Sequence, residues 1–205
     1  MPGSGALLPQ SLAAYNARGL SSVMESDGSH RKHVDRERGA DMAREEEAAF
    51  TELYRDYRTP LHQYALSLVR NREAAEDAVQ DAFLGWVRQL AAGKVPRRAA
   101  PYLYASVRNR CLDRLRRRPE VPLDEAHVEL LAAPAGDEER IGLRHVLNRG
   151  LLALPAEQRE VVVLRTWHDM EYSAIAALQG TPVNTAIARY HYGLTKLREE
   201  LEAHE

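Results

Sequence analysis

The chain has 205 residues, with 28 Lys or Arg against 30 Asp or Glu, and a formal net charge of −2. A hydrophobic content of 44% with 28% charged residues is typical of a soluble globular protein. No apolar run approaches the roughly 20 residues that span a bilayer, and no secretory leader pattern is present. The single cysteine, Cys111, excludes an intramolecular disulfide. We therefore expect a cytoplasmic protein with no membrane insertion of its own.

Residues 1–45 mix Gly, Ser and charges of both signs without sustained periodicity. Such a composition favours a mobile N-terminal extension over a packed element.

Residues 46–118 show helical spacing of apolar residues throughout, which predicts a compact all-helical domain. Pro60 is expected to end one helix and start the next. The first two predicted apolar faces contain Phe50, Leu53, Tyr54 and Tyr57, then Leu61, Tyr64, Ala65 and Leu68. The helix after them carries Ala75, Val79, Phe83 and Trp86 or Val87 on one side.

The last helix of this domain, in the stretch "PYLYASVRNRCLDRLRRR" at 101–118, concentrates positive charge. Leu103, Val107, Cys111 and Leu115 recur every four residues and form an apolar stripe, widened by Tyr104. Beside the stripe lies a row of cations at i, i+4 and i+7: Arg110, Arg114 and Arg117. A solvated helix face would explain the arginines alone, but their combination with tyrosines and Asn109 favours nucleic acid.

Residues 119–139 contain three prolines, seven acids and no Lys or Arg, which indicates an acidic linker. Helical periodicity returns over residues 140–205, where Pro155 is expected to open a helix. The short helix "YSAIAALQ" and the turn "GTPVN" then predict a helix-turn-helix, with Thr181 as N-cap and Pro182 as the first helical residue. The apolar residues expected along the final helix are Val183, Tyr190, Leu194, Leu197 and Leu201.

Enzyme chemistry is not expected. The acids of residues 73–81 have no His or Cys at metal-ligand spacing, and no phosphate loop or nucleophile motif appears. His168, Asp169 and Glu171 fall in a predicted turn, for which we favour a solvated loop over a metal site. No cofactor and no metal are predicted.

Taken in order, three motifs within residues 46–202 resemble the extracytoplasmic-function (ECF) branch of the sigma-70 family of bacterial RNA polymerase sigma factors. "AAEDAVQDAFLGWV" is similar to the family's polymerase-binding helix, and "YLYASVRNRCLDRLRRR" is similar to its promoter-melting helix. "LPAEQREVVVLR" resembles the opening of its second DNA-binding domain, with matches at Leu154, Pro155, Arg159 and Glu160. Any one motif alone would be weak, but their order makes the resemblance specific.

The resemblance implies an all-α protein of two small domains joined by the acidic linker, the second containing the helix-turn-helix. It implies core RNA polymerase and promoter DNA as partners, with an anti-sigma factor as regulator. The polymerase-binding residues implied are Glu76, Asp77, Gln80, Asp81 and Phe83. The residues implied for the minus-ten element are Tyr102, Tyr104, Arg108, Asn109, Arg110, Asp113, Arg114 and Arg117. Those implied on the recognition helix are Thr185, Ala188, Arg189, Tyr192 and Lys196.

Two positions depart from the family pattern. Tyr102 stands where the family usually has Trp, which keeps an aromatic ring but reduces its area. The recognition helix reads "PVNTAIAR", so Ile187 and Ala188 replace residues that normally face DNA. We therefore expect the first domain to dominate promoter recognition.

Two other functions fit parts of the sequence. A helix-turn-helix regulator would leave the basic first domain unexplained. A sigma-like decoy that titrates an anti-sigma factor would fit the unusual recognition helix, but it has no need for an arginine-rich helix that holds a melted strand.

Overall fold

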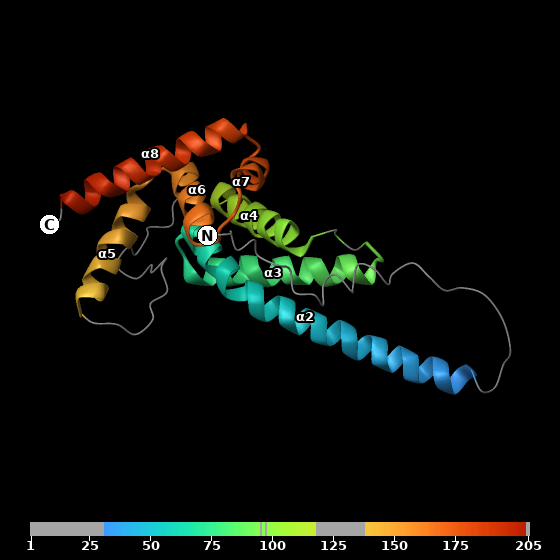
Figure 1. Ribbon diagram of the computed structural model, residues 1–205. Helices are drawn as coiled ribbons and strands as arrows, with labels where there is room; N and C mark the ends of the chain where they lie inside the picture. The colour runs from blue at the N-terminus through green and yellow to red at the C-terminus, as the bar shows by residue number, and fades with distance from the viewer. Residues whose placement is uncertain (1–30, 95, 97, 118–137, 204–205) are drawn as a thin grey trace, which may run out of the picture. The chain divides into compact units, whose positions relative to one another are not determined.

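The structure is a computed structural model that describes residues 31–94, 96, 98–117 and 138–203 (Figure 1). The described residues form seven α-helices and no strand, in agreement with the predicted all-α class. The chain divides into two compact units, residues 1–57 and 58–205, and the helix α2 (Arg31–Val69) runs through the boundary. In the first unit, the rings of Phe50 and Tyr54 lie 6.2 Å apart on successive turns of α2.

The predicted N-terminal extension lies partly outside the described residues, which begin at residue 31. Residues 31–45 belong to α2, so this part of the extension is helical, and its mobility stays a prediction. The predicted linker, residues 119–139, lies outside the described residues except for its last two positions, which begin α5 (Glu138–Ala153).

The expected helix restart at Pro60 is wrong, because Pro60 lies inside α2. A proline ring removes one backbone hydrogen bond and strains the preceding turn of a helix. The side chains that follow compensate by packing: Leu61 and Tyr64 have no exposed surface. Burying a large apolar side chain contributes about 1.5–3 kcal/mol, which offsets much of the proline penalty.

The helices α3 (Arg72–Ala91) and α4 (Ala99–Arg117) pack against each other in the second unit. Asn71 caps α3 by accepting a hydrogen bond from the backbone N–H of Ala74 at 2.8 Å. Most of the buried residues of α3 are small, which allows close approach of the helices; they are Ala74, Ala75, Ala78, Val79, Ala82, Phe83 and Trp86. The predicted apolar stripe of α4 is buried at Leu103, Val107 and Cys111, while Leu115 is 38% exposed.

Farther along the chain, α8 (Val183–Glu202) packs against α5, α6 (Ala156–Thr166) and α7 (Tyr172–Gln179), as Figure 1 shows for the red helix. Gly180 ends α7 in a left-handed conformation with φ of 67°, which gives the predicted tight turn before α8. The N-cap of α8 lies one residue after the predicted position, Thr181. Pro182 is the N-cap of α8, and the buried hydroxyl of Thr181 has no hydrogen-bond partner among the described residues.

The buried face of α8 matches the predicted one only in part: Leu197 is buried as expected. Val183 and Leu194 are exposed, and the buried positions are Ala186, Gly193 and Leu197. A Cβ atom placed on Gly193 would lie 2.7 Å from Cγ2 of Val162 in α6. The two helices therefore approach too closely for a large side chain at this crossing, which apolar spacing alone did not predict.

Candidate polymerase and nucleic-acid interface

An open groove lies between α3 and α4, and its walls carry opposite charges. Its lining includes Glu73, Asp77 and Asp81 from α3, and Arg110, Asp113, Arg114 and Arg117 from α4. Arg110 Nε lies 3.5 Å from the Asp81 carboxylate, and Arg114 Nη1 lies 3.8 Å from that of Asp77. Predicted polymerase-binding acids and predicted DNA-binding arginines thus share one surface.

These groove contacts are loose and largely exposed to solvent. The side chains of Arg110 and Asp81 retain about half of their exposure, at 53% and 49%. An ion pair of this kind contributes about 0–1 kcal/mol, because water and salt screen it. Both partners can therefore exchange their contact for a cation or phosphate of another molecule at small cost.

The remaining predicted residues of this surface differ in accessibility. Glu76, Gln80 and Asn109 are exposed, whereas Phe83 is buried in the helical core. Tyr102 is half-buried and its ring lies 5.5 Å from that of Trp86 in an edge-on arrangement. This ring contact holds Tyr102 at the start of α4.

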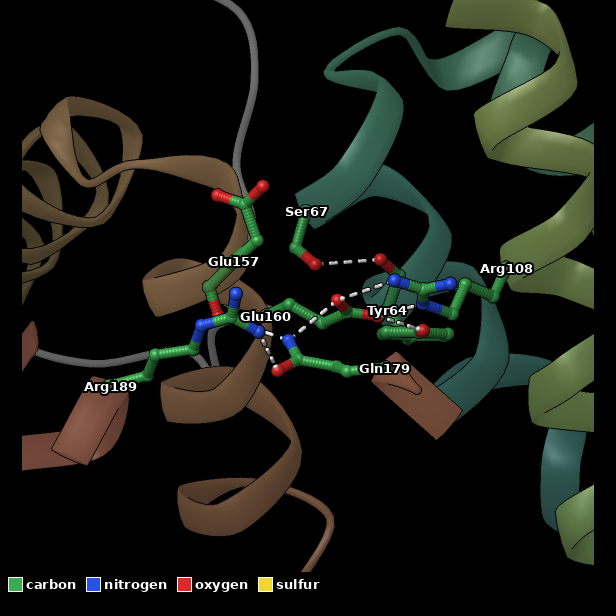
Figure 2. Close-up of polar contacts among 7 residues, drawn as sticks. All are labelled: Tyr64, Ser67, Arg108, Glu157, Glu160, Gln179 and Arg189. Atoms are coloured by element: carbon green, nitrogen blue, oxygen red, sulfur yellow. Dashed lines mark hydrogen bonds and ion pairs between the residues drawn. The ribbon is translucent and has the colours of Figure 1, made fainter. Parts of the chain in front are cut away.

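A buried carboxylate, Glu160 in α6, is the centre of a second polar site (Figure 2). Its Oε1 accepts hydrogen bonds from the Tyr64 hydroxyl at 2.6 Å and from Arg108 Nε at 2.8 Å. Its Oε2 accepts one from Gln179 Nε2 at 2.8 Å, and the amide oxygen of Gln179 accepts one from Arg189 Nη1 at 2.7 Å. We call these five residues the Glu160 network.

The Glu160 network satisfies a charge that would otherwise be costly to bury. The side chain of Glu160 is only 3% exposed and that of Arg108 17%. Burial and the neighbouring Glu160 charge raise the pKa of Tyr64 well above its usual value, so its hydroxyl stays protonated and able to donate. Three donors around one carboxylate are the arrangement that a buried anion requires.

A buried arginine, Arg159, lies beside Glu160 in sequence and bonds to backbone carbonyls instead of a carboxylate. Its Nε donates to the carbonyl of Ser67 at 2.7 Å, and its Nη1 donates to that of Leu154 at 3.0 Å. Ser67 is in the last turn of α2, whose carbonyls have no partner within the helix. Burial lowers the pKa of Arg159 to about 10, so the guanidinium remains charged at neutral pH.

An aromatic contact joins α4 to the turn after α6. The hydroxyl of Tyr104 lies 3.0 Å from Nδ1 of His168, and the two rings are 5.6 Å apart. Burial lowers the pKa of His168 to about 4, which keeps the imidazole neutral. The expectation of a solvated turn is therefore wrong for His168, because its ring packs against Tyr104 and Tyr64.

Three further residues predicted to bind DNA are engaged within the chain, away from the groove. Tyr104 contacts His168, Arg108 contacts Glu160, and Arg189 contacts Gln179. Their roles on DNA stay predictions, as do those of Ala188, Tyr192 and Lys196, which are exposed on α8, and of half-buried Thr185.

Sequence reasoning missed Tyr64, Glu160 and Gln179 as a connected polar set. The available signal was Glu160 itself, an acid directly before the apolar run "VVVL" on a face that must be buried. A buried acid requires donors, but nothing in the sequence identifies Arg108 and Gln179 as those donors.

Two parts of the chain each match a known protein family. Residues 53–119 match the family Sigma-70 region 2, and residues 144–197 match the family Sigma-70, region 4. The ECF RNA polymerase sigma factor SigM of Mycobacterium tuberculosis is 31% identical over 145 residues, covering 69% of this chain and 71% of SigM. The chain belongs to the ECF sigma factors.

Other sigma factors align over most of their lengths. RNA polymerase sigma factor CarQ of Myxococcus xanthus is 30% identical over 155 residues, covering 75% of this chain and 89% of CarQ. Among solved structures, the sigma factor RpoE in complex with the anti-sigma factor NepR from Bartonella quintana has a TM-score of 0.57 at 23% identity. That likeness covers 74% of this chain and 97% of RpoE, and it supports the shared fold.

A second solved structure, CnrH in complex with the cytosolic domain of CnrY, has a TM-score of 0.56 at 24% identity. It covers 78% of this chain and 91% of CnrH. In the part of the sigma factor that the structure describes, no helix is long and apolar enough to cross a membrane. The same residues contain no group of three His, Cys, Asp or Glu side chains that could hold a metal ion.

Proposed function

We propose that this sigma factor binds core RNA polymerase through the acidic face of α3 and holds promoter DNA along the basic face of α4. The observation that carries this assignment is the groove where Asp77 and Asp81 face Arg110 and Arg114. Exposed charges of both signs on adjoining helices offer separate attachment points for a basic protein surface and for phosphates.

On the polymerase side, Glu76, Asp77 and Asp81 meet basic residues, with exposed Gln80 as a neighbouring polar contact. Buried Phe83 supports this face from the core of the domain. Each exposed ion pair contributes about 0–1 kcal/mol, so affinity depends on several acids acting together.

On the DNA side, Arg110, Arg114 and Arg117 contact phosphates, while exposed Asn109 lies where an unpaired base could be read. Flipping a base out of the duplex costs a few kcal/mol of unstacking, which binding free energy must supply. Tyr102, at the start of the same helix, offers a ring for stacking. Asp113 forms an ion pair with Arg116 on the same helix and so holds one further cation beside this face.

The second domain adds upstream sequence preference through α8. Thr185, Ala188, Arg189, Tyr192 and Lys196 follow one another along the recognition helix. Tyr192 is 65% exposed, so its ring is available to a groove of DNA. Because α8 carries few cations, we expect it to contribute less to DNA affinity than α4 does.

We infer the remaining features from the family. RpoE and CnrH occur in complexes with the anti-sigma factor NepR and the cytosolic domain of CnrY, which supports an anti-sigma factor as the regulator here. The proposed function uses no cofactor, includes no catalytic step of its own, and places the protein in the cytoplasm with the polymerase. The acidic linker, residues 119–139, connects the two domains in the sequence.

Run-off transcription with purified core polymerase tests this function. The sigma factor should give transcripts from its promoter that core polymerase alone does not give. A protein that binds an anti-sigma factor but never supports transcription would be a decoy, and one that binds duplex DNA without core polymerase and represses it would be a helix-turn-helix regulator.

A further inference from the structure

A glycine in the interior of α3 lies against the first turn of α4. Glycine destabilises the interior of a helix relative to alanine, so Gly85 within α3 calls for a structural reason. A Cβ atom placed on Gly85 would lie 3.0 Å from the hydroxyl oxygen of Tyr102, which is tighter than ordinary van der Waals contact. The space left by the missing side chain is therefore the space that the Tyr102 hydroxyl uses.

The ring of Tyr102 is also held by the next residue of α3, Trp86. The two ring centres lie 5.5 Å apart with their planes at 61°, the edge-on arrangement that aromatic pairs favour. Trp86 is only 3% exposed, so the core of the domain fixes its position. Tyr102 itself is half-buried, which leaves part of its ring open to solvent. Two adjacent residues of α3 thus seat the hydroxyl and the ring of one tyrosine.

Tyr102 shares a face of α4 with Asn109, which the proposed function places where an unpaired base is read. The two residues are two helical turns apart, about 10 Å along the helix axis. A ring in line with exposed Asn109 can stack on another base of the same unpaired strand. A ring that is already held in place loses less conformational freedom when a base stacks on it, so its binding is stronger.

We propose that Gly85 is a positioning residue for Tyr102: it leaves room for the hydroxyl and so fixes the ring as a stacking platform for an unpaired promoter base. This inference rests on the proposed sigma function, because only strand opening brings unpaired bases to α4. Gly85 acts through the Tyr102 hydroxyl and needs no contact with DNA. Removal of that hydroxyl should therefore make position 85 tolerant of a methyl group.

The test is a double-mutant cycle in the full-length protein, with Gly85→Ala, Tyr102→Phe and the two changes together. Gly85→Ala adds the Cβ atom that meets the hydroxyl, and Tyr102→Phe removes the hydroxyl but keeps a ring for stacking. Gly142→Ala in α5 is the matched control, because nothing among the described residues lies within 4 Å of its added Cβ. Near-ultraviolet circular dichroism of the free proteins reports the contact between the rings of Tyr102 and Trp86.

Strand opening is measured with saturating holoenzyme by the reaction of permanganate with unpaired promoter thymines, and promoter binding is measured in parallel. Gly85→Ala should lower thymine reactivity about threefold to tenfold, a part of the contribution of one stacked base. Its affinities for the promoter and for core polymerase should change less. The double variant should open DNA as Tyr102→Phe does, and should match the near-ultraviolet spectrum of that protein.

Two results would overturn the proposal. One is a Gly85→Ala protein that opens the promoter as well as the wild type and Gly142→Ala do. The other is a loss of opening that Tyr102→Phe does not restore, since the methyl group would then act on something other than the hydroxyl.

Run-off transcription by the wild type separates these failures from failure of the sigma function. Transcription by the wild type with unimpaired opening by Gly85→Ala rejects only the role of Gly85. A wild type that never opens a promoter rejects the proposed function and the stacking platform with it, even where the near-ultraviolet spectra confirm the contact between Gly85 and Tyr102.

Discussion

The groove between α3 and α4 and the Glu160 network use the same residue types in opposite environments. In the groove, Arg110 and Asp81 are about half exposed and 3.5 Å apart. In the network, Arg108 and Glu160 are 17% and 3% exposed and 2.8 Å apart. Position in the fold therefore decides the role of an arginine on α4. An exposed ion pair can exchange its partner for another molecule, whereas a buried ion pair fixes the helices around it.

The largest expected effect comes from replacing the exposed cations of the groove. Arg110→Ala, Arg114→Ala and Arg117→Ala together should remove up to three phosphate contacts and lower the salt slope of DNA binding by about 3. The measurement is binding of the holoenzyme to matched promoters over a range of salt. Arg189→Ala should weaken promoter binding less than the triple change. A larger loss of promoter affinity from that single change would mean that the second domain contributes more to promoter binding than the first.

The buried contact of His168 should make the stability of the folded protein depend on pH. The pKa of His168 is lowered from 6.5 to about 4, so the folded protein favours the neutral ring. Stability from this residue is complete above pH 6.5 and falls as pH decreases toward 4, by at most about 3 kcal/mol. The neighbouring Tyr64, whose pKa is raised well above its usual value, stays neutral over this range.

Urea unfolding at pH 7 and pH 5 measures this effect. His168→Asn should show a smaller loss of unfolding free energy between the two values than the wild type. Equal losses in both proteins would mean that His168 titrates normally in the folded state.

The next largest effect, on the stability of the fold, is expected where α6 and α8 cross at close range. Gly193→Ala places a Cβ atom 2.7 Å from Val162 and should destabilise the protein by about 1–3 kcal/mol through overpacking. Gly142→Ala in α5 is the matched control, because nothing lies within 4 Å of its added Cβ. That change should stabilise by about 0.5–1 kcal/mol. Thermal unfolding of the two variants should shift in opposite directions, and a stabilised Gly193→Ala protein would contradict the observed crossing of α6 and α8.

The smallest effect is expected from the exposed acids, each of which contributes about 0–1 kcal/mol. Glu76→Lys with Asp77→Lys should weaken binding to core polymerase without altering the helical content. A control pair, Glu199→Lys with Glu202→Lys, makes the same charge change on exposed positions of α8. Unchanged core affinity for the first pair, or an equal loss for the second, would remove the acidic face of α3 from the interface.

The two charged helix faces that line the groove were predictable because helical spacing is local, whereas the packing of α3 against α4 that brings them together was not predicted. Helical spacing placed Arg110 and Arg114 beside the buried stripe of Leu103 and Val107, and the structure has them there. Pro60 was misjudged because a local rule for helix ends was overridden by burial of the residues after it.

The Glu160 network could not be predicted in the same way, because its hydrogen bonds join residues far apart in the sequence. Tyr64 and Glu160 are separated by 96 positions, and Arg108 and Glu160 by 52. Periodicity shows which face of a helix is buried but not which helix covers it. Part of the buried face of α8 was missed for a related reason, since the need for Gly193 follows from the position of Val162 in another helix.

Strand opening by the holoenzyme is the decisive measurement for the role of α4 in holding melted promoter DNA. Permanganate reacts with unpaired thymines, so it reports melting of the minus-ten element when the sigma factor and core polymerase are mixed with promoter DNA. We expect reactive thymines with the wild type. Changing exposed Asn109 to Ala should lower thymine reactivity more than it lowers promoter binding. A wild-type holoenzyme that binds the promoter but leaves its thymines unreactive would contradict the role assigned to α4.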